Sequence, residues 1–146
     1  MRTYTYRAVM EPGETPGVEV VTFPDVPEAI TEGVGRADAL LQAADALGLA
    51  LLAYLRQGRP LPRPAVKDGE RVTVAAEVAA KLAVLEAFAE AGISKSELAR
   101  RIGRDEREVR RILDPMHATK LPSLAEALAA LGRRLVVGVE DMRGAA

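Results

Sequence analysis

The spacing of hydrophobic and polar positions predicts strands in the first part of the chain and helices afterwards. Side chains in residues 2–10 alternate between two faces, which is the period-two pattern of a strand. Residues 11–17 contain two prolines and two glycines and predict a turn, so residues 18–23 return as the second strand of a hairpin. Residues 29–34, which end beside glycine, predict a short third strand.

A helix rich in leucine and alanine is predicted over residues 36–57, with Gly58 as its stop signal. Its buried side is predicted to carry Leu40, Leu41, Ala44, Leu47, Leu51, Leu52 and Leu55. Residues 59–64, RPLPRP, predict an extended connector, because proline fixes φ and has no amide donor for a helix. Residues 72–74 predict a fourth strand, and a first module therefore covers residues 1–74.

The second half of the chain predicts short helices, and residues 75–146 are assigned to a second module. It begins with a helix over residues 75–91. Ser94 and Glu97 then form a capping box, in which each residue satisfies a free amide at the start of the next helix. Gly103 ends that helix, because glycine adopts the left-handed conformation at a helix C-terminus without steric cost.

The helix that follows is predicted to be short and rich in arginine. Asp105 with Glu108 starts it, and Val109 and Ile112 give it a buried side. Its outward side chains include Arg107, Arg110 and Arg111. A short helix held at an angle by its predecessor, with cations outward, has the geometry that enters the major groove of DNA. The competing interpretation is an ordinary helical hairpin with a solvated arginine face.

The end of the chain predicts one more helix and then a strand. Ser123 and Glu126 form a third capping box. Residues 134–140 are rich in β-branched side chains and predict a final strand, whose exposed edge needs a partner. We expect the same strand of a second copy to pair with it, giving a homodimer or higher homo-oligomer; the competing partner is the strand at residues 72–74. The candidate dimerisation residues are Leu135, Val136, Val137 and Val139.

The charge distribution separates these arginines from the rest of the chain. The formal net charge is −1, yet residues 94–113 carry seven basic and four acidic side chains. A local cationic region on a nearly neutral protein favours a defined DNA-binding site over general coating of nucleic acid. The chain has no cysteine, so it forms no disulfide framework and no cysteine-based zinc site.

The pattern formed by Leu98–Ala99, Gly103, Val109 and Ile112 resembles the helix-turn-helix of lambda-repressor-type regulators. In that pattern a polar residue opens the first motif helix and contacts phosphate, and Lys95 occupies this place. Phosphate contacts position such a protein, whereas contacts to base edges specify the sequence. The candidate phosphate contacts are Lys95, Arg104 and Arg111, and the candidate base contacts are Glu106, Arg107 and Arg110. Ser96 is a further candidate DNA-binding residue.

A second resemblance covers nearly the whole chain. A predicted hairpin leads to FPDVP at residues 23–27, then to ITEG at residues 30–33, a leucine-alanine helix and a Pro-x-Pro segment. With LDPMHATKLPSLAEALAALGRRLVV at residues 113–137, this resembles the helix-turn-helix type of HicB antitoxin. The resemblance implies an α+β fold: a truncated RNase H-like β-β-β-α-β module, followed by an all-α helix-turn-helix module with a C-terminal strand.

The same resemblance implies a type II antitoxin that neutralises a HicA-like, mRNA-cleaving toxin and represses its own operon by binding operator double-stranded DNA. The candidate toxin contacts are Phe23, Pro24, Asp25 and Val26. The competing interpretation is that Phe23 and Val26 enter the core while the prolines stiffen a turn. The alternative function is a ligand-responsive transcriptional repressor with a small N-terminal sensor domain.

The chemistry of the chain predicts that it is not an enzyme and uses no cofactor or metal. An RNase H-like nuclease needs carboxylates for two metal ions, one of them from the first strand, and residues 4–8 offer none. His117 is the only histidine and has no nucleophile pattern near it. No charged leader is recognised and no apolar run approaches a membrane span, so we expect a cytoplasmic protein.

Overall fold

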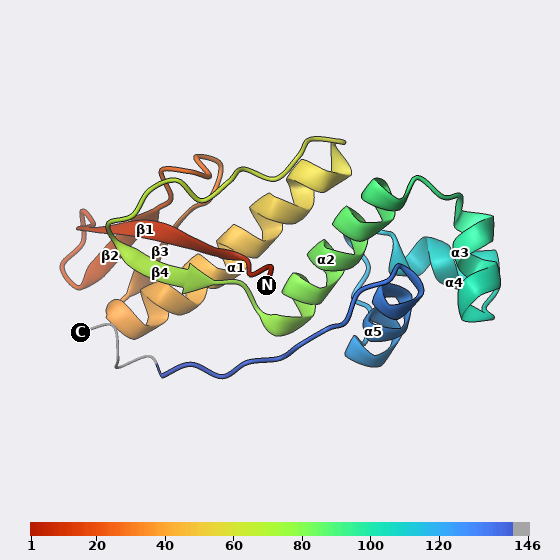
Figure 1. The fold of residues 1–146 in the computed structure, drawn as a ribbon. Helices are drawn as coiled ribbons and strands as arrows, with labels where there is room; N and C mark the ends of the chain where they lie inside the picture. The colour runs from red at the N-terminus through yellow and green to blue at the C-terminus, as the bar shows by residue number, and fades with distance from the viewer. Residues whose placement is uncertain (142–146) are drawn as a thin grey trace. The chain divides into compact units, whose positions relative to one another are not determined.

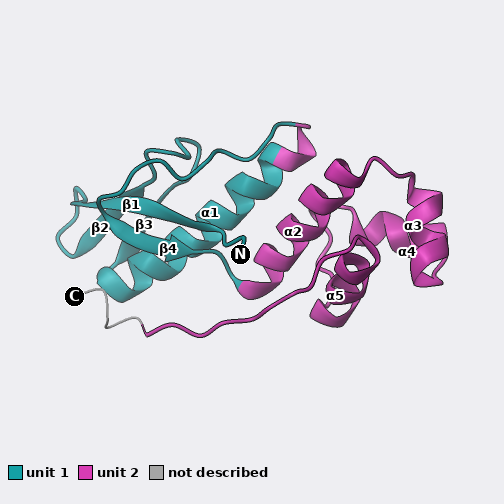
Figure 2. Ribbon diagram, viewed as in Figure 1, with its two compact units in different colours: residues 1–54, 59–75 teal, residues 55–58, 76–146 magenta. Residues whose placement is uncertain are grey.

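The computed structural model describes residues 1–141 and shows a mixed α+β protein, as the sequence predicts. Within this range the chain forms four strands and five helices (Figure 1), in the order β1 (Thr5–Pro12), β2 (Val18–Thr22), β3 (Ile30–Val34), α1 (Arg36–Arg56), β4 (Glu70–Thr73), α2 (Ala76–Ala91), α3 (Lys95–Ile102), α4 (Glu106–Ile112) and α5 (Leu121–Ala130). The chain divides into two compact units (Figure 2). Unit 1 comprises residues 1–54 and 59–75, and unit 2 comprises residues 55–58 and those from 76 onward.

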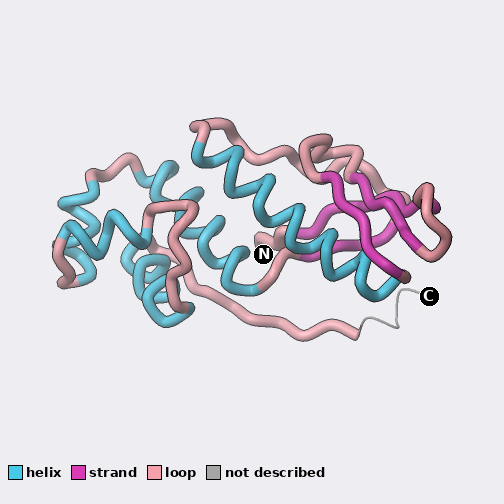
Figure 3. Tube along the Cα trace, turned by 180° about the vertical axis from the view of Figure 1, so that it is seen from behind, coloured by secondary structure: helices cyan, strands magenta, loops and turns pink. Residues whose placement is uncertain are grey.

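Unit 1 is an antiparallel sheet with α1 packed on one of its faces. The strand order is β3-β2-β1-β4, and every neighbouring pair is antiparallel. The helix α1 lies behind the sheet in Figure 1 and in front of it in Figure 3. The core of this unit includes Tyr6, Val21, Leu47 and Leu51, all fully buried. The element order β-β-β-α-β is the one predicted from the sequence.

A close backbone approach at Gly33 brings β3 against the start of α1. A Cβ atom at this position would lie 2.5 Å from both the backbone nitrogen and the Cα of Ala39, which no real side chain tolerates. Two hydrogen bonds fix the approach: the amide of Val34 donates to Oδ2 of Asp38 at 2.9 Å, and the amide of Ala39 donates to the carbonyl of Gly35 at 3.0 Å. Only small side chains therefore fit where the first turns of α1 meet the sheet.

This approach corrects the predicted buried side of α1. Leu47 and Leu51 are buried as predicted, but Leu41 is 67% exposed, and Ala39 and Ala43 are buried in its place. The prediction took leucine as the marker of the buried side. Near Gly33 the helix lies too close to the sheet for leucine, so alanine occupies the interface there and the leucine turns outward.

The proline-rich segment after α1 is extended, as predicted, but it packs within unit 1 and is not a free connector. Leu61 is buried, and the hydroxyl of Tyr6 donates to the carbonyl of Pro62 at 2.5 Å. The carboxylate of Asp25 accepts hydrogen bonds from the amides of residues 65–66, at 2.8 and 2.9 Å. These contacts tie the segment to β1 and to the loop that follows β2.

Unit 2 holds the 16-residue helix α2 and three short helices around one apolar core. Each helix contributes a fully buried side chain: Val84 from α2, Leu98 from α3, Val109 from α4 and Leu124 from α5. Burial of these side chains is what stabilises the unit, because helices of this length gain little from their own backbone hydrogen bonds.

The start of α5 differs from the prediction. The helix begins at Leu121, its N-cap residue Lys120 makes no capping hydrogen bond through its side chain, and Pro122 lies in the first turn. The predicted capping box of Ser123 and Glu126 is therefore wrong. Proline is favoured in a first turn because its fixed φ suits a helix and the amide that it lacks would have no helical partner there.

The predicted strand over residues 134–140 is absent from this single chain. The segment forms no ladder, and Val136, Val137 and Val139 are exposed, whereas Leu135 packs against the core of unit 2. A strand exists only with a partner to receive its hydrogen bonds, so the β-branched composition alone does not produce one.

Candidate nucleic-acid interface

The predicted N-caps Ser94 and Asp105 are confirmed, but the reciprocal half of the Ser94–Glu97 capping box is not found among residues 1–141, because the Glu97 carboxylate binds Arg100 and Arg101. Oγ of Ser94 accepts a hydrogen bond from the amide of Glu97 at 3.0 Å, and Oδ1 of Asp105 accepts one from the amide of Glu108 at 2.9 Å. Gly103 ends α3 in the left-handed conformation with φ 68°. These local interactions fix where each helix starts and how sharply the chain turns between them.

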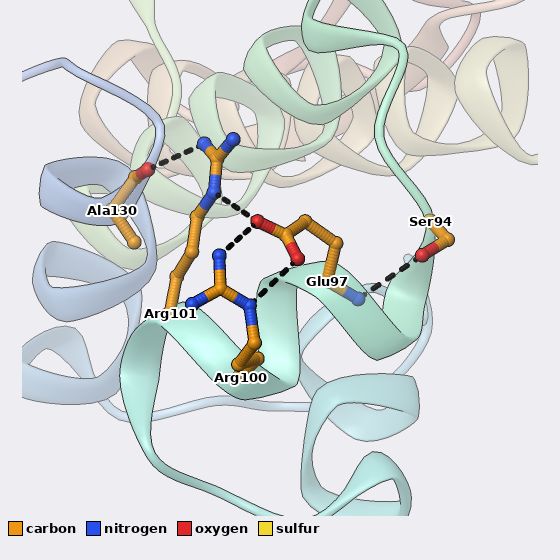
Figure 4. A network of polar contacts seen from close by, with 5 residues as sticks. All are labelled: Ser94, Glu97, Arg100, Arg101 and Ala130. Atoms are coloured by element: carbon orange, nitrogen blue, oxygen red, sulfur yellow. Dashed lines mark hydrogen bonds and ion pairs between the residues drawn. The ribbon is translucent and has the colours of Figure 1, made fainter.

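Several of the cations counted in the sequence are paired with carboxylates of unit 2. Glu97 binds Arg100 at 2.8 Å and Arg101 at 3.1 Å, and Arg101 also donates to the carbonyl of Ala130 at 3.2 Å (Figure 4). The hydrogen bonds from Arg100 and Arg101 lower the pKa of Glu97 to about 2. This carboxylate therefore stays ionised at neutral pH, and both arginines contribute less positive charge than the sequence count indicates.

Two predicted DNA contacts are also engaged within unit 2. Arg104 is half-buried and donates to Glu126 of α5 at 2.9 Å. Arg110 lies 3.5 Å from Glu106 one turn earlier on α4, and Glu106 also accepts a short hydrogen bond from Ser96 on α3. The predicted site residues Ser96, Glu106 and Arg110 are thus brought together, and Arg104 is directed to α5 instead.

Three predicted cations remain available on the surface. Lys95 at the start of α3, and Arg107 and Arg111 on α4, are all exposed. Among residues 1–141 their side chains make no hydrogen bond or ion pair. Charged side chains without an internal partner keep their full charge for an external one, and phosphate oxygens accept from both lysine and arginine.

The loop predicted to contact a toxin lies mostly inside unit 1. Phe23 and Val26 are fully buried, and Asp25 is engaged with the proline-rich segment as described above. Of the four candidate residues only Pro24 is exposed. The geometry matches the competing interpretation, in which the loop is structural.

Sequence reasoning missed an apolar surface on the outer face of the sheet. Ile30 and Val34 are 63% and 74% exposed and lie on the face of β3 opposite to the buried Gly33. In the sheet, Ile30 pairs with Thr22 of β2 and Val34 pairs with Val18. Val9 of β1 pairs with Thr22 on its other side and lies on the same face. The sequence does contain a signal for this surface. In residues 30–34, Ile30, Glu32 and Val34 alternate with Thr31 and Gly33, so the apolar side chains lie on the side of the strand opposite to glycine.

Sequence reasoning also missed a buried lysine. Lys81 of α2 is 4% exposed, and its ammonium nitrogen donates to the carbonyls of Arg111 and Ile112 at 3.1 and 2.7 Å and to Oγ1 of Thr119 at 2.7 Å. Burial lowers the pKa of Lys81 to about 8, and the carboxylate of Asp114 opposes this change. The group is therefore protonated at neutral pH with three acceptors around it.

Neither a metal centre nor a convincing membrane span is found in the described part of the chain. Among residues 1–141, no group of three or more histidine, aspartate or glutamate side chains is placed to hold a metal ion. The sequence predicts no apolar run of membrane length, yet α1 is long and apolar enough to cross a membrane by length and composition alone. Its buried side packs on the sheet, and core helices often meet the same criterion, so this is weak evidence of a span.

Comparison with known proteins identifies the class to which this arrangement belongs. A family model described as HicB_like antitoxin of bacterial toxin-antitoxin system matches residues 5–85. Antitoxin HicB 1 of Photorhabdus laumondii is 36% identical over 140 residues, which are 96% of this chain and 90% of that protein. Antitoxin HicB of Escherichia coli (strain K12) is 39% identical over 121 residues, covering 82% and 88% of the two chains. For Antitoxin HicB of Pseudomonas fluorescens (strain Pf0-1) the identity is 33% over 138 residues, covering 92% and 94%.

The chain therefore belongs to the HicB-like antitoxin family of bacterial toxin–antitoxin systems, and the resemblance seen in the sequence is confirmed. Membership implies a toxin as partner, and relatives named as antitoxins belong to a class that generally lacks enzymatic activity.

The lowered pKa of Lys81 predicts a specific pH dependence of stability. Below about pH 8 the lysine is charged in both the folded and the unfolded chain, and the cost of burying the charge is present in full. Between about pH 8 and 10.5 the unfolded chain holds a proton that the folded chain has released, so stability rises with pH. The free energy of unfolding of the wild type, relative to Lys81→Met, should rise by on the order of 1–3 kcal/mol across this range.

Denaturant titrations of the two proteins at pH 7 and pH 10 measure this difference, and titrations of all other groups cancel in it. A difference that stays constant with pH would show that Lys81 keeps its ordinary pKa in the folded chain.

Proposed function

We propose that this antitoxin represses its own operon by binding operator DNA through unit 2, and that it neutralises a HicA-like, mRNA-cleaving toxin through unit 1. The observation that carries the DNA-binding role is the capped pair α3 and α4, on which the side chains of Lys95, Arg107 and Arg111 are exposed and have no partner within residues 1–141. The family model spans mostly unit 1, which supports placing the toxin-binding role there.

In the proposed DNA complex, α3 and α4 act as the helix-turn-helix and α4 enters the major groove. Lys95 and Arg111 bind phosphate, and Arg107 reads a base edge. Arg104 reaches DNA only by leaving Glu126, and Arg110 only by leaving Glu106. The free energy that each arginine adds to DNA binding is therefore reduced by the loss of its ion pair. Glu106 is itself a candidate to accept a hydrogen bond from cytosine once Ser96 and Arg110 release it.

In the proposed toxin complex, the outer face of the sheet in unit 1 docks the toxin. The element order supports a truncated RNase H-like unit, and α1 covers only the inner face of its sheet. The exposed Ile30 and Val34 on β3, with Val9 and Val20 on the neighbouring strands, give this outer face apolar side chains around Glu32, which pairs with Val20. Exposed apolar patches of this kind mark interaction sites, and the partner implied by the family is a toxin.

In the proposed assembly, residues 134–140 of two copies pair as an antiparallel ribbon. The three exposed valines of this segment support the proposal, because a ribbon gives their backbone a partner and places them in a shared surface. Two copies on a two-fold axis also read two half-sites, which a single short helix cannot do.

Arg107→Ala should weaken binding to an operator fragment from upstream of the antitoxin gene by about 1–3 kcal/mol, as loss of a bidentate base contact does.

Lys95→Ala should weaken binding to all sequences alike and make the slope of log affinity against log salt concentration shallower by about one unit, as loss of one phosphate contact does. Fluorescence anisotropy over a range of salt concentrations measures both effects. The matched control is Arg100→Ala, an exposed arginine bound to Glu97, which should change affinity little. Equal effects of Arg100→Ala and Arg107→Ala would place the binding surface elsewhere.

Ile30→Lys and Val34→Lys should each weaken binding of the co-encoded toxin by at least about tenfold, because a charge would be buried in an apolar interface. Calorimetric titration of toxin into antitoxin measures the affinity. Leu49→Lys is the matched control, since Leu49 is equally apolar and exposed but lies on α1. If Leu49→Lys abolishes toxin binding while the two β3 variants bind normally, the docking face is the helix and not the sheet.

A chain ending at Arg133 should be monomeric at micromolar concentration while unit 2 stays folded, because the ribbon is removed and the four helices are kept, with only Leu135 lost from the packing around their core. Light scattering gives the mass and circular dichroism the helix content. A truncated chain that remains a folded dimer rules the ribbon out as the main contact.

A further inference from the structure

A lysine of α2 reaches the end of α4 from inside unit 2. Lys81 is the buried residue whose ammonium nitrogen donates to the carbonyls of Arg111 and Ile112 and to Oγ1 of Thr119. At 4% exposure it has no route to DNA phosphates of its own. Among residues 1–141, it is the one charged side chain in the buried class.

The C-terminus of α4 needs such a donor. The helix has only seven residues, and the last carbonyls of any helix lack partners within it. Gly103 ends α3 in the left-handed conformation, but the residue that ends α4 is Leu113, with φ −89° and ψ −2°. No glycine-type cap closes α4, and the ammonium of Lys81 supplies hydrogen bonds and a positive charge where the helix dipole is negative.

The same ammonium also holds the loop that follows α4. Oγ1 of Thr119 accepts from Lys81 and lies 3.2 Å from Nδ1 of His117. The carboxylate of Asp114 accepts the amide of Met116 at 2.9 Å and is the acidic group that acts electrostatically on Lys81. One buried charge therefore contacts both the end of α4 and the loop at Thr119, and it adds to the turn hydrogen bonds that Asp114 and His117 make within the loop.

We infer that Lys81 is a positioning residue for DNA binding, whose ammonium holds the last turn of α4 so that Arg107 and Arg111 keep the spacing that DNA contact requires. The inference rests on the proposed DNA-binding role of unit 2. The carbonyl of Arg111 is itself one of the acceptors, so the ammonium holds the backbone of a proposed phosphate contact directly. The neighbouring core positions Leu82 and Val84 are apolar, and an apolar residue at position 81 would fill the space without the cost of burying a charge.

Lys81→Met in the full-length chain tests the inference, because methionine keeps the length and removes the donors. We expect operator affinity to fall about tenfold, since the carbonyl of Ile112 loses the donor that the structure gives it and the last turn of α4 loosens. The carbonyl of Arg111 keeps the amide of Asp114 as a donor. The slope of affinity against salt concentration should stay at the wild-type value, because no phosphate contact is lost. Amide hydrogen exchange should accelerate in α4 and residues 113–119 and be unchanged in α3.

Two control variants separate positioning from contact. Arg111→Ala should lower the salt slope by about one unit and leave hydrogen exchange of α4 near the wild-type value. Lys120→Met removes an exposed lysine from the same loop and should change neither hydrogen exchange nor the helix content.

Operator binding by Lys81→Met within twofold of the wild type, with unchanged exchange in α4, would overturn the inference. If Lys81→Met does not fold, Thr119→Val serves instead, because it removes one acceptor of the ammonium. Its operator affinity should fall about threefold, with faster hydrogen exchange confined to α4 and residues 113–119. Wild-type operator affinity and wild-type exchange in Thr119→Val would equally overturn the inference. If the wild type itself binds no operator fragment, the proposed function fails, and the positioning role in DNA binding fails with it.

Discussion

The ends of two short helices govern the arrangement of unit 2. Helices α3 and α4 contain eight and seven residues, and nucleating a helix costs more than so few backbone hydrogen bonds return. Each end also leaves amides or carbonyls that must find partners elsewhere. Ser94 and Asp105 satisfy the amide ends, Gly103 turns the chain after α3, and Lys81 satisfies the carbonyl end of α4. The apolar core holds the helices together, but the caps decide where they start, stop and point.

The electrostatics of this unit depend more on pairing than on the number of charges. Glu97 binds two arginines, and Glu126 draws Arg104 onto α5. Exposed ion pairs of this kind add little stability, yet they neutralise side chains that a sequence count assigns to DNA. Non-specific affinity for DNA grows with the number of phosphates neutralised, so internal pairing lowers the non-specific affinity that the count of basic residues predicts.

Local signals in the sequence were sufficient for part of the fold. The alternation in β1, the turn between β1 and β2, and the caps Ser94, Gly103 and Asp105 each depend on a few consecutive residues, and all were predicted. The outward turn of Leu41 was not, because it results from contact between Gly33 and Ala39 across two elements. Lys81 gave no local signal, since a lysine in an amphipathic helix ordinarily faces water. Its acceptors come from residues about 30 positions later in the chain.

The most recognisable motif of the chain, FPDVP, lies mostly inside unit 1 and braces it. Phe23 and Val26 fill the core, and Asp25 holds the proline-rich segment in place. A second tie, in which the hydroxyl of Tyr54 donates to Glu28 at 2.6 Å, fixes the end of α1 to the same loop. A unit braced in this way presents its sheet in one conformation, and a rigid surface loses little conformational entropy when it binds. The motif therefore restricts the conformation of the unit that carries the exposed Ile30 and Val34, which lie on β3, where the chain has no comparable signature.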